Sequence, residues 1–252
     1  MKNLKIATYN LRCVYNKDGI NSFIHRAVLA ADKIEDEKPD VIGFQEITPK
    51  NLTVMEKLLP EYSFVGQFRS ASFDTEGLYV AVRKESCMLL GFESVWLSPT
   101  PYVPGSRFED QSHCPRICVQ AKIRHIESGK IFRVFNIHLD HISESARVLG
   151  INSVFEFIDS FNDGAPIALL GDFNAHPDSD TVALCNARKG LRDVTANIPT
   201  TFHNYGKTSE KIDYIYLSGE LADSVAEVNA WTDEINGIYL SDHYPVCAEI
   251  AL

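Results

Sequence analysis

The feature that most constrains the fold is a long stretch, residues 62–138, in which no helical periodicity is found. It contains strand-like runs separated by glycine, serine and proline: GLYVAVRK, MLLGFESVWL, RICVQAKIRHI and KIFRVFNIHL. Strands that follow one another without an intervening helix pair antiparallel, because a parallel pair needs a long crossover connection. The middle of the chain is therefore predicted to form an antiparallel sheet.

Both flanks of this stretch mix strands with helices. On the N-terminal side, strands are predicted at residues 4–10 and 41–46, and helices at 23–34 and 50–59. On the C-terminal side, helices are predicted at 143–161 and after Asp178 or Ser179, and strands at 167–170, 211–217, 221–231 and 244–252. No linker or internal repeat interrupts this pattern. We therefore predict one α/β domain over residues 1–252, with mixed, mainly antiparallel sheets packed together and helices on the outside.

Composition limits the partners that the chain is expected to bind. With 34 acidic and 24 basic residues, the formal net charge is -10, so the molecule as a whole repels polyanions. The 6 cysteines form no close C-x-x-C pair, which argues against a disulfide framework and a tetrahedral zinc site. No signal-peptide pattern or membrane-spanning apolar run is found. We expect a cytoplasmic protein with reduced thiols, no membrane association and no obligate protein partner.

Polar residues stand at the ends of the apolar strands. Four of them close a predicted strand: Asn10, Glu46, His138 and Asp172. Others stand at or just before the start of a strand: Asp213, Asp242 and His243. If the second group of strands runs antiparallel to the first, all these side chains lie at one edge of the sheets. The sequence thus predicts one polar site.

The chemistry that uses such a set is metal-assisted attack of water on phosphorus. Carboxylates such as Glu46, Asp172 and Asp242 are hard oxygen ligands suited to Mg²⁺. Histidines bind phosphoryl oxygens or transfer protons, and each usually needs a carboxylate that fixes its tautomer. Candidate carboxylates are Glu76 for His138 and Asp213 for His243. Asn10 and Asn174 offer neutral oxygen or amide contacts.

Each residue taken alone also has a purely structural interpretation. Asp172 and Asn174 are compatible with an Asx turn, Glu46 with a helix cap, and His138 with a buried core histidine. Asp242 with His243 is compatible with a turn, and Arg116 with a surface strand position. An EF-hand loop after Asp172 is excluded, because Pro177 and Ala183 replace its required glycine and glutamate. The joint occurrence of these residues at strand ends favours a site.

Seven ordered motifs resemble those of the endonuclease/exonuclease/phosphatase superfamily, the DNase I-like group: TYN at Asn10, QE at Glu46, EGLYV at Glu76, NIHLDH at His138, LLGDFN at Asp172, KIDYI at Asp213 and SDHYPV at His243. The stretches VWLSPTPYVPGS, PRICVQAKI and TTFHNYG are most similar to a bacterial branch near the deadenylase and nocturnin type. The resemblance implies a four-layered α/β sandwich, in which two sheets pack face to face.

The resemblance also implies roles for the individual residues. The metal ligands would be Glu46, Asn10, Asp242 and Asp172, holding Mg²⁺ or, as a substitute, Mn²⁺. Asp172 and Asn174 would position or activate the attacking water. The scissile phosphate would be contacted by His138 and His243, oriented by Glu76 and Asp213, with Arg116 and Asn174 as further phosphate-binding residues.

The resulting hypothesis is a Mg²⁺-dependent phosphoester hydrolase, with a phosphodiesterase or nuclease acting on nucleotides or single-stranded nucleic-acid ends as the preferred form. The alternative is a phosphatase of a small phosphorylated metabolite, such as a sugar, inositol or nucleotide. A catalytically inactive binding module is disfavoured, because no expected ligand is missing. The net acidity favours a small or single-stranded substrate over duplex DNA.

Overall fold

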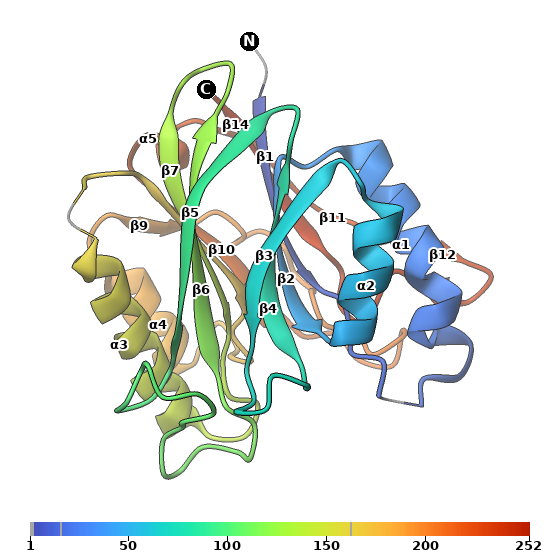
Figure 1. The fold of residues 1–252 in the computed structure, drawn as a ribbon, viewed down its shortest axis with the longest axis horizontal. Coiled ribbons are helices and arrows are strands. Elements are labelled where there is room, and N and C mark those ends of the chain that lie inside the picture. Colours follow the sequence, from blue (N-terminus) through green and yellow to red (C-terminus); the bar gives the residue numbers. More distant parts are fainter. Residues whose placement is uncertain (1–2, 16, 162) are drawn as a thin grey trace.

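The computed structural model describes residues 3–15, 17–161 and 163–252, and its framework is a pair of six-stranded sheets (Figure 1). The first sheet has the order β11-β14-β1-β2-β4-β3, with β1 Asn3–Asn10, β2 Val41–Ile47, β3 Tyr62–Phe68, β4 Gly77–Arg83, β11 Val225–Ala230 and β14 Val246–Ala251. The second has the order β5-β6-β7-β8-β10-β9, with β5 Cys87–Trp96, β6 Ile117–His125, β7 Ile131–His138, β8 Ile167–Asp172, β9 Leu191–Asp193 and β10 Asp213–Ser218.

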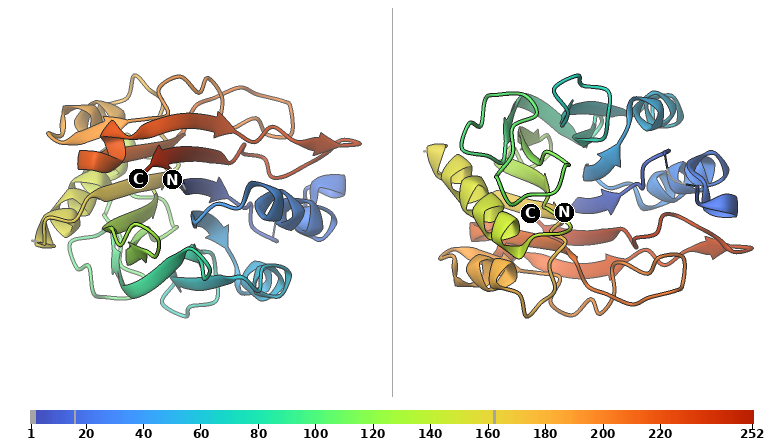
Figure 2. Two further views of the ribbon diagram at one scale, coloured as in Figure 1. Left: turned by 90° about the horizontal axis from the view of Figure 1, so that it is seen from above. Right: turned by 90° about the horizontal axis from the view of Figure 1, so that it is seen from below.

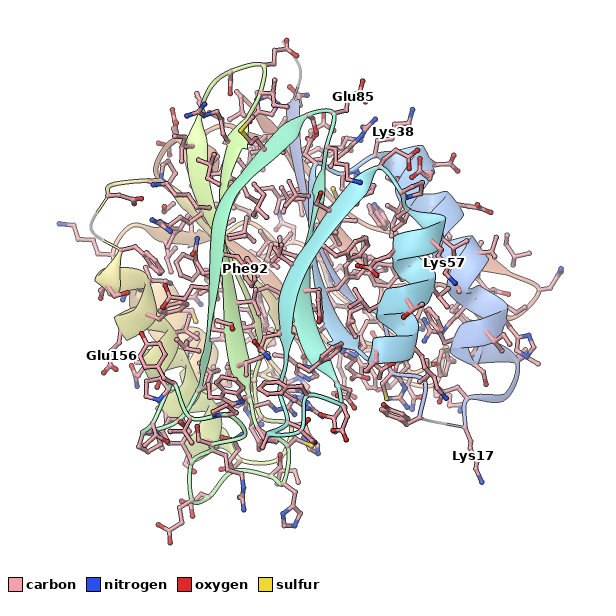
Figure 3. All side chains as sticks on the ribbon, viewed as in Figure 1. Lys17, Lys38, Lys57, Glu85, Phe92 and Glu156 are labelled. Carbon is pink, nitrogen blue, oxygen red and sulfur yellow. The ribbon has the colours of Figure 1, made fainter. Side chains whose placement is uncertain are left out.

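Helices cover the outer faces of both sheets (Figure 2). Helices α1 (Phe23–Glu37) and α2 (Pro49–Leu58) pack on the first sheet, and α3 (Glu144–Ser160) and α4 (Asp180–Ala187) pack on the second. A third apolar core fills the space between the two sheets. The outward faces of α2 and α3 carry charged side chains such as Lys57 and Glu156 (Figure 3). The predicted four-layered α/β sandwich is confirmed.

The topology gathers particular strand ends at one end of the sandwich. Each sheet contains one parallel pair, β1–β2 and β7–β8, and α1 and α3 form their crossover connections. The carboxyl ends of these four strands lie at the end of the sandwich away from the two chain termini (Figure 1). Strands β10 and β14 run antiparallel to β8 and β1, so the segments that enter them lie at the same end. This confirms the sequence-based expectation for one shared edge.

Local sequence explains most element boundaries. Helix α2 starts at a capping box in which Thr48 and Asn51 exchange hydrogen bonds, so Thr48 and not Glu46 is its cap. Ser143 and Ser179 cap α3 and α4, where each hydroxyl oxygen accepts one backbone N–H of the first turn. The strand predicted at residues 221–231 is wrong over its first part, where α5 (Gly219–Asp223) forms instead. Two adjacent residues, Leu221 and Ala222, are both buried there, and a strand would point them to opposite faces.

Smaller elements complete the described chain: a 3-10 helix at Gly19–Asn21 and a hairpin of β12 (Glu234–Ile235) and β13 (Ile238–Tyr239). None of the described helices combines the length and the apolar character needed to cross a bilayer.

Candidate active site

The carboxylate of Asp172, the last residue of β8, is the centre on which the polar side chains converge. Its Oδ1 accepts the backbone N–H of Asn174 at 2.9 Å, and its Oδ2 accepts Nδ2 of Asn10 at 2.9 Å. The Nε2 atoms of His138 and His243 lie 3.4 and 3.8 Å from the same Oδ2. The Asx turn to Asn174 is therefore present, but it forms part of a larger cluster.

Gly171 explains how β8 delivers this carboxylate. Its φ of +141° is unfavourable for a residue with a side chain, and an added Cβ would lie 2.0 Å from the carbonyl oxygen of Ile137 in β7. Only glycine fits at this point, so the strand can approach β7 closely while its next residue turns into the site.

His243 forms the pair that the sequence predicts. Its Nδ1 donates to Oδ2 of Asp213 at 2.8 Å, and both side chains are buried. Burial alone would lower the pKa of this imidazole, but the contact with Asp213 and the nearby Asp172 carboxylate raise it to about 10. Burial and the charge of Asp213 raise the pKa of Asp172 to about 7, against the opposing effect of His243. The site thus holds a histidine that is cationic at neutral pH beside a carboxyl group that titrates there.

The expected pairing of Glu76 with His138 differs from the structure. Glu76 forms an ion pair with Nη2 of Arg69 at 2.7 Å, and His138 contacts the carboxylate of Asp172. Burial and the positive charges of Arg116 and Arg69 lower the pKa of His138 well below its ordinary value. Because Arg69 pairs with the carboxylate of Glu76, His138 has no carboxylate of its own of the kind that holds His243.

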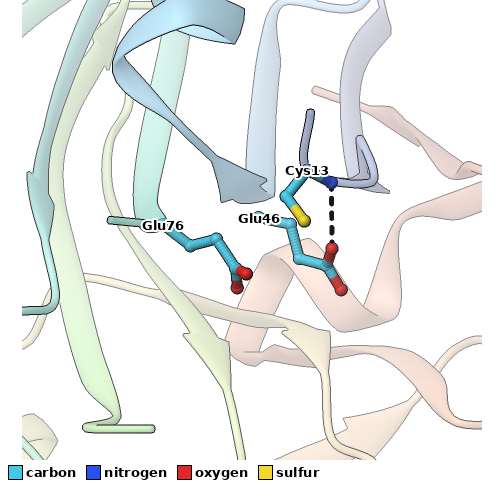
Figure 4. Close-up of side chains that lie close together, drawn as sticks. All are labelled: Cys13, Glu46 and Glu76. Atoms are coloured by element: carbon cyan, nitrogen blue, oxygen red, sulfur yellow. Dashed lines mark hydrogen bonds between the residues drawn. The ribbon is translucent and has the colours of Figure 1, made fainter. Parts of the chain in front are cut away.

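Glu46 lies near the C-terminal end of β2 and belongs to a second group of acidic side chains in the site. It adopts a left-handed φ of 57°, and its carboxylate accepts the backbone N–H of Cys13 at 3.0 Å and Nδ2 of Asn10 at 3.2 Å. Figure 4 shows the Cys13 and Glu76 side chains beside it. Asn10 was expected to offer its oxygen to a metal, but that oxygen accepts the backbone N–H of Arg12, and its nitrogen faces the carboxylates. Asn10 therefore links Glu46 to Asp172.

Asp242 lies close to this group from the segment that precedes β14. Its Oδ2 is 3.2 Å from Nη1 of Arg12, and its Oδ1 accepts the hydroxyl of Ser241 at 3.1 Å. Burial and the negative charge of Glu46 raise the pKa of Asp242, with Arg12 acting in the opposite direction. Burial and Glu46 likewise raise the pKa of Glu76. Glu46 differs: burial disfavours its charge, but the hydrogen bond from Cys13 and the charges of Arg12 and His243 lower its pKa.

This donor set fits a hard divalent cation. Glu46, Asp242 and Asp172 supply the carboxylate oxygens that such ions prefer. A cation would offset the burial and the neighbouring negative charges that raise the pKa values of Asp242 and Asp172. Among the described residues, two groups of three side chains each bring their potential ligand atoms within 4.8 Å of one another: Cys13, Glu46 and Glu76 in the first, and Asp172, Asp213 and His243 in the second. In the second group the hydrogen bond between Asp213 and His243 already uses two of the atoms. The first group contains two carboxylates, Glu46 and Glu76, beside the thiol of Cys13.

Arg116 is buried at the base of the site with incomplete hydrogen bonding. Its Nη2 donates to Nδ1 of His141 at 3.0 Å, and its Nε lies 3.9 Å from Oδ2 of Asp140. Within the part of the chain that the structure describes, Nε and Nη1 have no hydrogen-bond partner. Burial and the neighbouring Arg69 lower its pKa to about 10, so it remains cationic at neutral pH. A buried guanidinium with unpaired N–H groups is suited to an oxyanion ligand.

These residues surround one pocket of about 480 Å³. Its walls include most of the predicted site residues: Glu46, Glu76, Arg116, His138, Asp172, Asn174, Asp242 and His243. Asn10 and Asp213 stand behind this wall, where they hold Asp172 and His243. Further lining residues were not predicted from the sequence, among them Arg12, Arg69, His176 and Glu210. His141 and Phe202 also line the pocket, and both stand in motifs that the sequence makes visible, NIHLDH and TTFHNYG.

Solved structures share this fold over the whole chain. An endonuclease/exonuclease/phosphatase from Bacteroides vulgatus is 27% identical, with a TM-score of 0.92 and 100% of each chain covered. A mannosyl-6-phosphatase from Bacteroides thetaiotaomicron is 27% identical, with a TM-score of 0.88 over 99% of this chain and 100% of that chain. The human Nocturnin catalytic domain, solved with a bound sulfate anion, is 16% identical with a TM-score of 0.74 over 99% and 93% of the chains, a likeness of fold alone.

A comparison with curated proteins finds no match. The model of the endonuclease/exonuclease/phosphatase family matches residues 7–243, nearly the whole chain. The fold, the ordered motifs and this match lead to one conclusion: the chain belongs to the endonuclease/exonuclease/phosphatase family and is a hydrolase of phosphoester bonds.

Proposed function

We propose that the protein is a Mg²⁺-dependent phosphomonoesterase that acts on a small phosphorylated molecule. The observation that carries this proposal is the compact pocket of about 480 Å³ with the partly unpaired Arg116 buried in its wall. A pocket of this size suits a small ligand, and unpaired guanidinium N–H groups suit the oxygens of a terminal phosphate. A structural neighbour at 27% identity is a mannosyl-6-phosphatase, which supports the same substrate class.

In the proposed mechanism, Asp172 is the base and His243 is the acid. Asp172, whose pKa lies near 7, accepts a proton from the attacking water while the new oxygen–phosphorus bond forms. The bond from phosphorus to the alcohol oxygen breaks, and the protonated Nε2 of His243 gives its proton to that oxygen. Asp172 and His243 lie 3.8 Å apart, so the proton can return to His243 after release of inorganic phosphate. Arg116 and the neutral His138 hold the other phosphate oxygens.

When bound beside Glu46 and Asp242, a divalent cation supplies Lewis-acid stabilisation of the phosphoryl oxygens. The ligand carboxylates are kept apart and aligned by neutral or cationic donors of the chain itself. Asn10 fixes Glu46 relative to Asp172, and Arg12 holds Asp242. We take Mg²⁺ as the working ion because the donors are oxygens, and Mn²⁺ as its substitute.

Hydrolysis of a phosphodiester at a nucleic-acid or nucleotide end, the form that the sequence favoured, is the second candidate. The observation that favours it is Phe202, which lines the pocket with its ring centroid 4.9 Å from that of His243. An aromatic ring beside the reacting phosphate can stack on a base. The acidic balance of the chain weighs against a long polyanionic substrate.

The test compares p-nitrophenyl phosphate with bis-p-nitrophenyl phosphate, in Mg²⁺, in Mn²⁺ and in EDTA. We expect metal-dependent cleavage of the monoester, loss of activity in EDTA, and a fall in kcat of roughly 10²-fold or more in Glu46→Gln. The control is Glu56→Gln, an exposed glutamate of α2. Preferred cleavage of the diester would support the second candidate. Activity that persists in EDTA or in Glu46→Gln would contradict both.

A further inference from the structure

One set of pocket residues has no part in the mechanism above: His176, Phe202 and Glu210. They belong to two loops, one that follows Asp172 and one that leads into β10. The side chains of His176 and Glu210 are partly exposed, whereas the residues around the phosphate are buried. This set, which we call the outer wall, therefore lies where the pocket opens to solvent.

The outer wall is rigidly connected to the catalytic histidine. The backbones of Phe202 and Glu210 exchange two hydrogen bonds of 2.9 Å, and Phe202 forms a β-bridge with His243. The carboxylate of Glu210 accepts the hydroxyl of Thr208 at 2.9 Å and lies 3.5 Å from Nε2 of His176. A ligand group that touches these side chains is consequently held at a fixed place relative to His243.

The chemistry of the outer wall matches a neutral polyhydroxylated molecule. A carboxylate and an imidazole accept and donate hydrogen bonds to hydroxyl groups, and an aromatic ring covers the apolar face of a sugar ring. The negative charge of Glu210 repels a second phosphate or the backbone of a nucleic acid. Within the outer wall only the imidazole of His176, 3.5 Å from this carboxylate, could offset its charge. The arginines of the pocket contact other side chains: Asp242, Glu76 and His141.

We propose that His176, Phe202 and Glu210 form a subsite for the leaving alcohol, and that this alcohol is a neutral polyol such as a hexose. The inference rests on the proposed phosphomonoesterase function and specifies its substrate class. It assigns phosphate binding to the buried residues and recognition of the alcohol to the outer wall. The phosphate and the alcohol are then bound by different side chains. Mutations of the outer wall can therefore change alcohol recognition while phosphate binding is kept.

The experiment measures kcat/KM of the Mg²⁺-loaded enzyme for three monoesters: mannose 6-phosphate, fructose 1,6-bisphosphate and p-nitrophenyl phosphate. In the wild type we expect a higher kcat/KM for mannose 6-phosphate than for fructose 1,6-bisphosphate. In Glu210→Gln the ratio of mannose 6-phosphate to p-nitrophenyl phosphate should fall by about tenfold, as expected for the loss of a charged hydrogen bond, and the discrimination against the bisphosphate should shrink. The control, Glu109→Gln, changes an exposed carboxylate outside the pocket and should keep both ratios.

A second variant, His176→Gln, tests the same subsite with little risk of misfolding, because this side chain is more than half exposed. It should lower the same ratio, chiefly through KM. Unchanged ratios in both variants, with monoesters still hydrolysed, would overturn the subsite and leave the phosphomonoesterase proposal intact. Absence of phosphate release from all three monoesters by the metal-loaded wild type would overturn both.

Discussion

At the scale of single residues, the charge of His243 depends chiefly on Asp213. The carboxylate of Asp213 contacts its Nδ1 and, with nearby carboxylates, raises its pKa to about 10 despite burial. The protonated form is therefore dominant at neutral pH and is lost only as the pH rises through that value. If this proton goes to the leaving alcohol, kcat must fall on the alkaline side.

Asp213→Asn tests this dependence, because it keeps the size of the side chain and removes its charge. We expect kcat at neutral pH to fall roughly 10²- to 10⁴-fold. The alkaline fall of the kcat profile should move from near pH 10 toward 6.5, the ordinary pKa of histidine. The measurement is kcat against pH in wild type and variant. An alkaline limb at the same pH in both proteins would show that His243 is not the acid.

His203 provides a prediction about stability. Its ring is buried and stacks on Tyr244 at 3.9 Å, and its Nδ1 accepts the backbone N–H of Gly206. Burial and the nearby His243 lower its pKa to about 4. Since the unfolded chain binds this proton near pH 6.5, the unfolded state is favoured progressively as the pH falls from 6.5 toward 4.

When the pH falls from neutral to about 5, the free energy of unfolding should decrease in both the wild type and His203→Phe. We expect the decrease to be about 1–2 kcal/mol larger in the wild type. Urea denaturation at several pH values measures this difference. Parallel stability curves for the two proteins would contradict the buried, neutral state of His203.

At the scale of elements, helix α1 is tied to the site by Arg26. This side chain is fully buried, and its guanidinium donates to the carbonyls of Asn21 at 3.0 Å, Leu240 at 3.1 Å and Arg12 at 2.9 Å. Two of these carbonyls belong to the segments that carry the ion pair of Arg12 with Asp242. The helix thereby fixes two loops of the candidate active site relative to each other.

Arg26→Lys retains the charge but cannot reach all three carbonyls. We expect a loss of about 2–4 kcal/mol in the free energy of unfolding, because buried carbonyls lose their donors. We also expect weaker binding of Mn²⁺ by the substrate-free protein, since Asp242 loses its fixed position. Calorimetry measures the metal affinity independently of turnover. A variant with wild-type stability and metal affinity would show that the three hydrogen bonds of Arg26 are dispensable.

At the scale of the whole molecule, the sequence predicted the elements with strong periodicity and the residues at their ends. Apolar strands followed by a polar residue identify Asp172 and His138, and antiparallel pairing with β8 brings Asp213 opposite Asp172. The sequence could not predict which charged groups pair across loops. Glu76 was expected to pair with His138, but its carboxylate forms an ion pair with Arg69. This ion pair forms only because the segment after β3 folds back. A single arginine on a loop carries no periodic signal.

The central proposal is that the protein hydrolyses terminal phosphates of small molecules with a bound divalent cation. The most direct measurement is kcat/KM of the Mg²⁺-loaded enzyme for mannose 6-phosphate and for its methyl phosphodiester, assayed side by side. We predict that the monoester is hydrolysed at least tenfold more efficiently, because in the diester a methyl group replaces a hydrogen-bonding site on one of the phosphate oxygens that Arg116 and His138 are proposed to hold. Equal or faster hydrolysis of the diester would contradict the account and establish a phosphodiesterase.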